Sequence, residues 1–305
     1  MTVEYLGGEV LLVPQDELEQ NVEYARHRFT SISSGFRDGA QSNLIGSPRR
    51  VVELHDLFEG NLGTSWDNHS GQRHIKGSTQ LYQGILHRSL KTLSQERDHA
   101  PGRVLVIDQH TLPHIVQEVE DAISGKYDLV LRPVFEGGSG PVDAASPEDL
   151  CDIMEAAFQV WVKHPESRVE PFYSLYQRRI ARHQVDASGH PRANAHAGCP
   201  FQSDCAFKSL SLDPDGSIYI CQEMADSKNY PLGNAIEGTF EDATWRMLSR
   251  RTAHLSDDCS TCEWREECGG GCMNEAIQHH GDPFAKTELC PVWKTIFRNI
   301  DATIN

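Results

Sequence analysis

Eight of the nine cysteines in this chain lie between Cys199 and Cys290. Their spacing is C-x5-C-x15-C over the first three and C-x2-C-x5-C-x3-C-x17-C over the other five. Packing does not explain such intervals, because a buried face repeats every two or about 3.6 residues and has no need of cysteine. A metal centre does need thiolates, held on short loops so that several sulfur atoms converge on one point.

Glycines accompany these cysteines. Gly216 precedes Cys221 by five residues, and a Gly-Gly-Gly run fills the interval between Cys268 and Cys272. Glycine lets the backbone adopt a positive φ and approach a bulky inorganic group closely. The cysteines and glycines together predict two iron–sulfur sites.

Two other interpretations of the cysteines remain open at this point. Disulfides would pair the thiols in a secreted protein, but residues 1–20 lack the basic start and apolar run of a signal peptide. A chain of 305 residues also has room for a core that needs no disulfides. Zinc sites of four thiolates each are the stronger alternative, because the Cys259-x2-Cys262 pair suits zinc equally well.

The cysteine pattern resembles the SPASM domain, the C-terminal extension of many radical SAM enzymes, including peptide maturases and anaerobic sulfatase-maturing enzymes. All eight cysteine positions are filled, and the accompanying Tyr219, Leu232-Gly233-Asn234 and Gly-Gly-Gly-Cys segments are present. The resemblance favours iron over zinc and implies two auxiliary [4Fe-4S] clusters. It assigns the first cluster to Cys199, Cys205, Cys221 and Cys272, and the second cluster to Cys259, Cys262, Cys268 and Cys290.

The N-terminal part resembles a radical SAM barrel at three segments and one arginine, which occur in the family's order. A Gly-Gly-Glu segment follows a short strand-like run, as in the family's GGEPLL segment, which holds the amino group of S-adenosylmethionine; Val10 stands where proline is usual. Residues 41–44 and 62–67 resemble the ends of the third and fourth barrel strands, and an arginine follows near the position that meets the cofactor's carboxylate. The resemblance therefore implies these cofactor-binding residues: Gly7, Gly8, Glu9, Ser42, Asn43, Ser65, Asp67 and Arg73.

Apolar periodicity predicts an α/β fold. Helices are expected over about 16–29, 79–93 and 111–124, and a fourth from Pro147 with Ser146 as its N-cap. Strand-like runs lie between them at Val104–Ile107 and Tyr127–Leu131, and such alternation predicts a parallel sheet with ligands at the carboxyl ends of its strands. With the resemblance, we predict a partial (βα) radical SAM barrel over 1–182, a linker over 183–198 and a small cysteine-rich SPASM domain over 199–305.

The three-cysteine motif that binds the catalytic cluster of radical SAM enzymes does not occur in this sequence. No cysteine precedes Cys151, which we interpret as a buried thiol on the apolar side of a helix. The chain opens at what resembles the barrel's second strand, so the first strand and a third [4Fe-4S] cluster are expected to be absent. We favour a misplaced gene start or a fragment over a degenerate family member or a partner chain that supplies the strand. This chain alone is expected to be inactive.

The resemblance implies an oxidoreductase-type enzyme in which a radical from S-adenosylmethionine modifies a peptide or protein substrate. The substrate is expected with or without a leader peptide, and an electron donor is an expected partner. Sulfatase maturases carry an aspartate directly after the third SPASM cysteine as a base. Here Gln222 and then Glu223 follow Cys221, so a ribosomal-peptide maturase is favoured over a sulfatase maturase, and Glu223 is the candidate base. A non-catalytic iron–sulfur module that binds a peptide or transfers electrons is the alternative from another class.

The charge of the chain limits its partners. Asp and Glu number 44 against 28 Lys and Arg, which gives a formal net charge of −16. Nucleic acid is therefore not an expected partner, because phosphate binding needs a basic surface. No apolar stretch approaches the roughly 18 residues of a membrane span. The cysteine usage is typical of the reducing cytoplasm.

Overall fold

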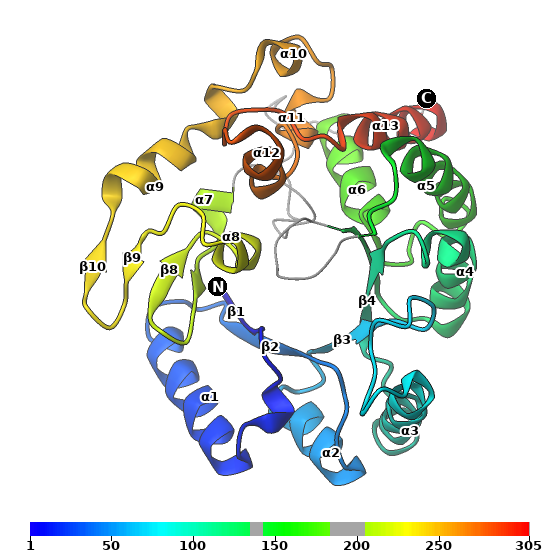
Figure 1. The fold of residues 1–305 in the computed structure, drawn as a ribbon, viewed down its shortest axis with the longest axis vertical. Helices are drawn as coiled ribbons and strands as arrows, with labels where there is room; N and C mark the ends of the chain where they lie inside the picture. The colour runs from blue at the N-terminus through cyan, green and yellow to red at the C-terminus, as the bar shows by residue number, and fades with distance from the viewer. Residues whose placement is uncertain (135–142, 184–204, 305) are drawn as a thin grey trace. The chain divides into compact units, whose positions relative to one another are not determined.

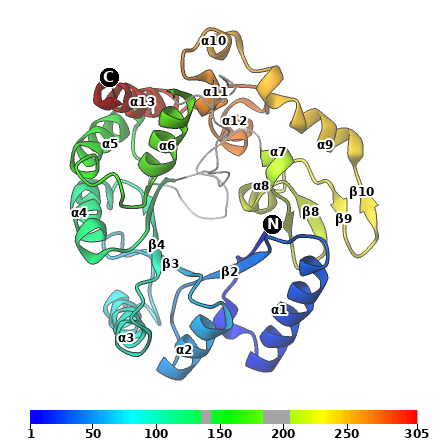
Figure 2. The same ribbon diagram turned by 180° about the vertical axis from the view of Figure 1, so that it is seen from behind.

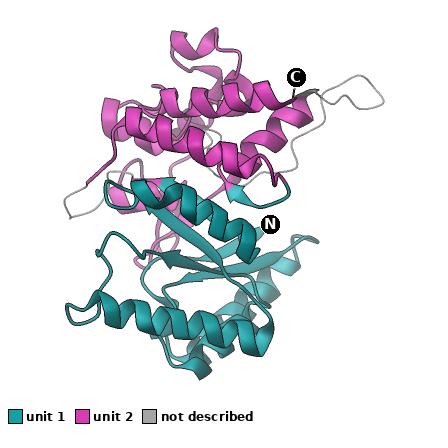
Figure 3. Cartoon of the chain, turned by 90° about the vertical axis from the view of Figure 1, so that its right-hand side faces the viewer, with its two compact units in different colours: residues 1–132, 166–169 teal, residues 133–165, 170–305 magenta. Residues whose placement is uncertain are grey.

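The computed structural model describes residues 1–134, 143–183 and 205–304. Two compact units divide the chain, residues 1–132 with 166–169 and residues 133–165 with 170–305 (Figure 3). The predicted linker over 183–198 falls almost entirely outside the described residues, so the predicted domain boundaries stay a prediction.

A six-stranded sheet with the strand order β1-β2-β3-β4-β5-β6 is the framework of the first unit. The pairs β1–β2, β2–β3 and β3–β4 are parallel, and β1 lies at the edge of the sheet. Strands in chain order, with helices between them, confirm the predicted α/β class. The strands are β1 (Thr2–Tyr5), β2 (Arg37–Ser42), β3 (Leu62–Trp66), β4 (Gly102–Ile107), β5 (Leu129–Pro133) and β6 (Val169–Glu170).

Four helices of the first unit lie on one face of this sheet (Figure 1), and Figure 2 shows the same arrangement from behind. They are α1 (Gln15–Thr30), α2 (Pro48–Leu57), α3 (Thr79–Arg97) and α4 (Ile115–Gly125). Between helices and strands lies a core that includes the fully buried Val22, Leu54, Leu86, Leu105 and Val119.

The sequence-based helix predictions of this unit are confirmed, with two differences. The helix expected over 111–124 begins with a 3-10 turn, η2 (Leu112–His114), because Pro113 stands in its first turn. The helix α2 is not among the predicted ones, although Ser47 caps its first N–H groups and Pro48 stands at its first position.

The two longest of the other helices in the second unit pack against its C-terminal helix. The helix α5 (Pro147–Trp161) packs against α13 (Cys290–Ile304), which also contacts α6 (Phe172–His183). Ser146 accepts a hydrogen bond from the N–H of Asp149 at 3.1 Å, which confirms the predicted N-cap. Cys151 is half-buried, so its thiol is less buried than predicted.

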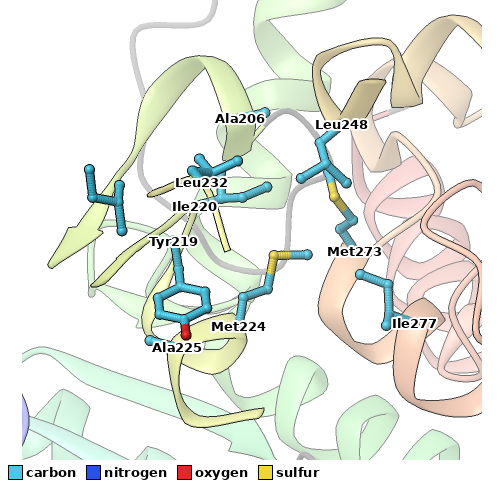
Figure 4. Packing of buried hydrophobic residues seen from close by; sticks show 10 residues of the cluster. Ala206, Tyr219, Ile220, Met224, Ala225, Leu232, Leu248, Met273 and Ile277 are labelled. Carbon is cyan, nitrogen blue, oxygen red and sulfur yellow. The ribbon is translucent and has the colours of Figure 1, made fainter. Parts of the chain in front are cut away.

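The rest of the second unit consists of short elements around a hydrophobic cluster. The cluster includes Ile220, Met224, Leu248 and Met273 (Figure 4). The strands β7 (Ser211–Leu212), β8 (Ser217–Tyr219), β9 (Gly233–Asn234) and β10 (Thr239–Phe240) form an antiparallel sheet. The helices are α7 (Cys205–Lys208), α8 (Gln222–Ser227), α9 (Asp242–Ser249), α10 (Asp257–Ser260), α11 (Arg265–Cys268) and α12 (Met273–His280). Among the helices described, none has both the length and the apolar character that a membrane crossing requires.

Candidate functional site

Glu9 is the centre of a group of predicted cofactor-binding residues in the first unit. Its carboxylate accepts hydrogen bonds from the Ser42 hydroxyl at 2.6 Å and from the backbone N–H of Asn43 at 2.8 Å. A third comes from the backbone N–H of Leu11 at 3.1 Å. Because β1 and β2 are parallel neighbours, their carboxyl ends bring together residues more than thirty positions apart. With three donors on it, the carboxylate holds this turn together.

The turn after β2 has an unusual backbone. Leu44 is fully buried and has a φ of 56°, a left-handed conformation that is costly for a leucine. Its N–H binds the Ser42 hydroxyl at 3.0 Å, and its carbonyl accepts a hydrogen bond from the Ser89 hydroxyl at 2.8 Å. Backbone strain that hydrogen bonds hold in place is typical of ligand-binding turns.

Gly7 and Gly8 follow β1 with φ values of 79° and 54°, in the left-handed region that favours glycine. A Cβ on either residue would meet no atom within 4 Å, so glycine is required here by conformation and not by space. Both residues are exposed. Their backbone groups, unlike the Glu9 carboxylate, therefore face space that a ligand can enter.

Ser65 and Asp67 lie at the carboxyl end of the neighbouring strand β3, as predicted. The Gln41 side-chain amide donates to the Ser65 hydroxyl at 3.1 Å, which links β2 and β3 at this edge. The Asp67 carboxylate accepts hydrogen bonds from the backbone N–H groups of His69 at 3.2 Å and Ser70 at 2.9 Å. Asp67 therefore shapes the loop that leads to Arg73.

Tyr82 of α3 is a site residue that sequence analysis missed. Burial raises the pKa of its phenol; nearby Arg73 acts to lower it, and Asp67 and Glu9 act to raise it. Three predicted cofactor-binding side chains therefore lie within electrostatic range of one buried phenol. The sequence carries no signal for this role, because Tyr82 has the spacing of an ordinary core residue on an amphipathic helix.

Seven of the eight predicted cluster ligands lie in the described residues, and Cys199 lies outside them. Each of the seven stands within two residues of a helix end, where short loops can turn the thiol inward. None of the cysteines in the described ranges forms a disulfide. Within the same ranges, no three His, Cys, Asp or Glu side chains converge closely enough to hold a single metal ion.

The four cysteines assigned to the second cluster line one cavity of about 360 Å³: Cys259, Cys262, Cys268 and Cys290. Aromatic side chains, among them Trp264 and Trp293, form part of its wall. A zinc ion needs its sulfur ligands at about 2.3 Å from one point, whereas a polynuclear cluster needs a hollow between them. The chemistry of this donor set and the space between its members fit a [4Fe-4S] cluster.

Cys268 is half-buried and lies at the end of α11. Burial raises the pKa of its thiol to about 12, although hydrogen bonds from the N–H groups of Gly270 and Gly271 act to lower it. Such a thiol is protonated at neutral pH without a metal, and a bound metal deprotonates it. Gly270 has a φ of 84°, and a Cβ there would come within 2.5 Å of the Leu255 side chain. Both conformation and space therefore require glycine in this loop.

The cysteines assigned to the first cluster surround the hydrophobic cluster of Figure 4. Cys205 and Cys221 pack against it, and Cys272 directly precedes its member Met273. These three cysteines stand at the first residue of α7 and directly before α8 and α12. Because Cys199 lies outside the described residues, the four-ligand assignment of this site stays a prediction.

Glu223 lies in the first turn of α8, two residues after Cys221. It is half-buried. The Ser227 hydroxyl donates to its backbone carbonyl at 2.8 Å, which stabilises this short helix. Since α8 belongs to the second unit and the Glu9 group to the first, the predicted role of Glu223 as a base is not tested by these contacts.

Comparison with known proteins gives a likeness in structure. No family model matches the chain, and no curated protein matches it. The solved structure of anSMEcpe with bound AdoMet matches with a TM-score of 0.75 at 15% identity, over 99% of this chain and 80% of that chain. anSMEcpe with AdoMet and the Kp18Cys peptide matches with a TM-score of 0.74 at 15% identity, over 99% and 84%. SuiB of Streptococcus suis matches with a TM-score of 0.54 at 13% identity, over 95% and 66%.

The first two structures are of an anaerobic sulfatase-maturating radical SAM/SPASM enzyme, and SuiB is a radical SAM peptide modifier. At such low identities the likeness shows a shared fold. The resemblance to radical SAM/SPASM proteins that the cysteine spacing indicates is therefore confirmed at the level of the fold.

Proposed function

We propose that this chain is a radical SAM/SPASM-type enzyme that modifies a side chain of a peptide or protein, in the manner of ribosomal-peptide maturases. One observation carries this proposal: the four cysteines of the predicted second cluster line a single cavity. Solved structures of the same fold hold AdoMet, and two of them also hold a peptide.

S-adenosylmethionine would bind in the first unit, at the carboxyl ends of β1, β2 and β3. The exposed backbone of Gly7 and Gly8 would accept hydrogen bonds from its ammonium group, and Arg73 would pair with its carboxylate. Glu9 would act indirectly, because its carboxylate already holds the turn at Ser42 and Asn43. In this proposal the sheet is a partial barrel, and β1 at its edge is the second barrel strand.

The eight cysteines would hold two auxiliary [4Fe-4S] clusters in the second unit. When bound, such clusters supply electron transfer at low potential. The chain positions the thiols at helix ends, and Trp264 and Trp293 line the second site. Glu223, one residue beyond the aspartate position of sulfatase maturases, is the proposed base, and its displacement favours a peptide maturase.

A non-catalytic iron–sulfur module is the second candidate. The cavity that four cysteines line would serve such a module equally well. Under either candidate the two auxiliary sites are the same, and the two candidates differ only in the use of S-adenosylmethionine.

The test compares this chain with a version extended in frame upstream, both reconstituted anaerobically with iron and sulfide. We expect 5′-deoxyadenosine from the longer version alone. Within it, Arg73→Ala should reduce the yield by at least about tenfold, because one charge-assisted pair is lost. Arg88→Ala is the matched control, since Arg88 is exposed on α3. Clusters in both versions without 5′-deoxyadenosine from either would favour the module, and no cluster in either would contradict both candidates.

A further inference from the structure

Arg251 carries a positive charge into the interior of the second unit. It stands at the start of the 3-10 turn η3 (Arg251–Ala253), directly after α9, and its side chain is 0% exposed. Burial of a charge is costly unless an opposite charge or hydrogen bonds offset the cost. Within the described residues, no carboxylate is paired with this guanidinium, and its Nε has no hydrogen-bond partner.

The hydrogen bonds of Arg251 show where it is held. Nη1 donates to the carbonyl of Pro283, and Nη2 donates to the carbonyl of Gly270 at 3.0 Å. Gly270 lies between Cys268, a ligand of the predicted second cluster, and Cys272, a ligand of the first. A Cβ on Gly270 would lie 3.3 Å from Nη2. Glycine thus lets the guanidinium approach the loop that joins the two cluster sites.

Thiols assigned to both predicted clusters affect the pKa of the Arg251 guanidinium. Burial lowers the pKa of Arg251, and four nearby thiols act in the opposite direction. In decreasing order of effect they are Cys272, Cys205, Cys259 and Cys268. The first two belong to the predicted first cluster and the last two to the second. Arg251 is therefore within electrostatic range of both sites.

A cubane of four iron atoms with four thiolate ligands has a net charge of about −2 in its oxidised form. Two such clusters would add about −4 to a chain whose formal charge is already −16. A guanidinium suits this position because it keeps its proton in protein interiors, whereas a buried ammonium group loses its proton more readily.

We propose that Arg251 is a shared positive charge for both auxiliary clusters, which holds the Gly270 loop and raises the reduction potential of each cluster. The inference rests on the two-cluster function proposed above. A reduced cluster carries one more negative charge than an oxidised one, so a fixed cation nearby favours the reduced form. Arg251 is thus a positioning residue, because it touches the loop that carries the ligands and not the reacting atoms.

The test is a redox titration followed by EPR on the reconstituted chain, together with iron and sulfide content. Arg251→Gln removes the charge and keeps one amide donor, so both midpoint potentials should become more negative with the iron content retained. Arg251→Lys keeps the charge and should leave both potentials close to their wild-type values. Arg246→Gln is the control, because it removes an exposed arginine of α9 that pairs with Asp242 at the surface, and it should leave both potentials unchanged.

Three outcomes would overturn the inference. An unchanged potential for either cluster in Arg251→Gln would show that the charge is not shared. Equal shifts in the Gln and Lys variants would assign the effect to lost hydrogen bonds. If Arg251→Gln takes up less iron than wild type, its potentials are not comparable and the Arg251→Lys variant decides. Wild-type potentials of both clusters in Arg251→Lys would support the inference. More negative potentials of both clusters in Arg251→Lys would contradict it. A wild-type chain that binds no cluster would instead contradict the proposed function.

Discussion

The guanidinium of Arg179 donates to both carboxylate oxygens of Asp301, from Nε at 2.6 Å and from Nη2 at 3.1 Å. Its Nη1 binds the Glu267 carboxylate at 2.8 Å, and Asp301 also accepts the indole N–H of Trp264 at 2.8 Å. The network joins α6 and α13 to α11, which ends at Cys268. It therefore supports one side of the four-cysteine cavity.

Asp301→Ala should destabilise the second unit by about 3 kcal/mol, because it leaves the Arg179 charge only partly paired. This value is at the low end for a buried pair, since the Asp301 side chain keeps 19% of its exposure. Anaerobic urea denaturation of the reconstituted chain measures the change. Asp242→Ala, which breaks an exposed pair with Arg246, is the control and should cost less than about 1 kcal/mol. Equal costs for the two variants would contradict the role of the network.

Glu9→Ala should lower the free energy of unfolding of the first unit by about 1–3 kcal/mol. The reason is that the Asn43 N–H and the Ser42 hydroxyl lose their acceptor while they remain partly or fully buried. Glu17→Ala provides the matched control, because Glu17 is an exposed glutamate of α1. Urea denaturation followed by circular dichroism measures both variants. If Glu9→Ala unfolds at the wild-type midpoint, the carboxylate does not hold the turn.

Cys290→Ser should remove the second cluster and leave the first, so that the iron content falls to about half of the wild-type value. The serine hydroxyl is a poor ligand for iron that thiolates otherwise hold. Cys151→Ser should leave the iron content unchanged, because Cys151 lies on α5 and belongs to neither set of ligands. Loss of all iron in Cys290→Ser, or any loss in Cys151→Ser, would be incompatible with two separate sites.

Glu275 should give the second unit a pH-dependent stability. Burial raises the pKa of its carboxyl above the ordinary 4.5, although hydrogen bonds from Thr287 and the Leu289 N–H act to lower it. Between 4.5 and the raised value the folded protein binds more protons than the unfolded one, so stability falls as pH rises through this window.

Glu275→Gln has no titrating carboxyl group at this position, so its stability relative to wild type should rise as the pH rises above 4.5. This difference should become constant above the raised pKa of Glu275. Urea midpoints of both proteins between about pH 5 and pH 8 provide the measurement, and the other acids of the chain cancel in the difference. Parallel curves over this range would show that burial does not shift the Glu275 carboxyl.

The elements with strong local signals were predictable from sequence. The helix from Pro147 to Trp161 has an N-cap serine, a proline at its first position and a regular apolar stripe, and the structure confirms it. The cysteine spacing also indicated the fold through its resemblance to the SPASM domain of radical SAM enzymes. The convergence of Glu9 with Ser42 and Asn43 followed from the order of the parallel strands.

Arg251 and Tyr82 could not be found in the same way. Arg251 follows Arg250 directly, and two adjacent arginines usually indicate an exposed, solvated segment. Its burial depends on the packing of η3 against the Gly270 loop, to which its guanidinium donates a hydrogen bond, and no local pattern encodes that packing. The sequence also suggested that the Glu9 carboxylate accepts hydrogen bonds from the cofactor. In the structure this carboxylate already accepts hydrogen bonds from three groups of the protein.

The central claim is that the cysteines between Cys199 and Cys290 hold two four-iron clusters. Anaerobic reconstitution of the chain, with iron, acid-labile sulfide and zinc counted per chain and EPR of the reduced protein, tests it most directly. The account predicts about eight iron and about eight sulfide per chain, two reduced cluster signals and no zinc. Zinc in place of iron, or about four iron with a single signal, would contradict it.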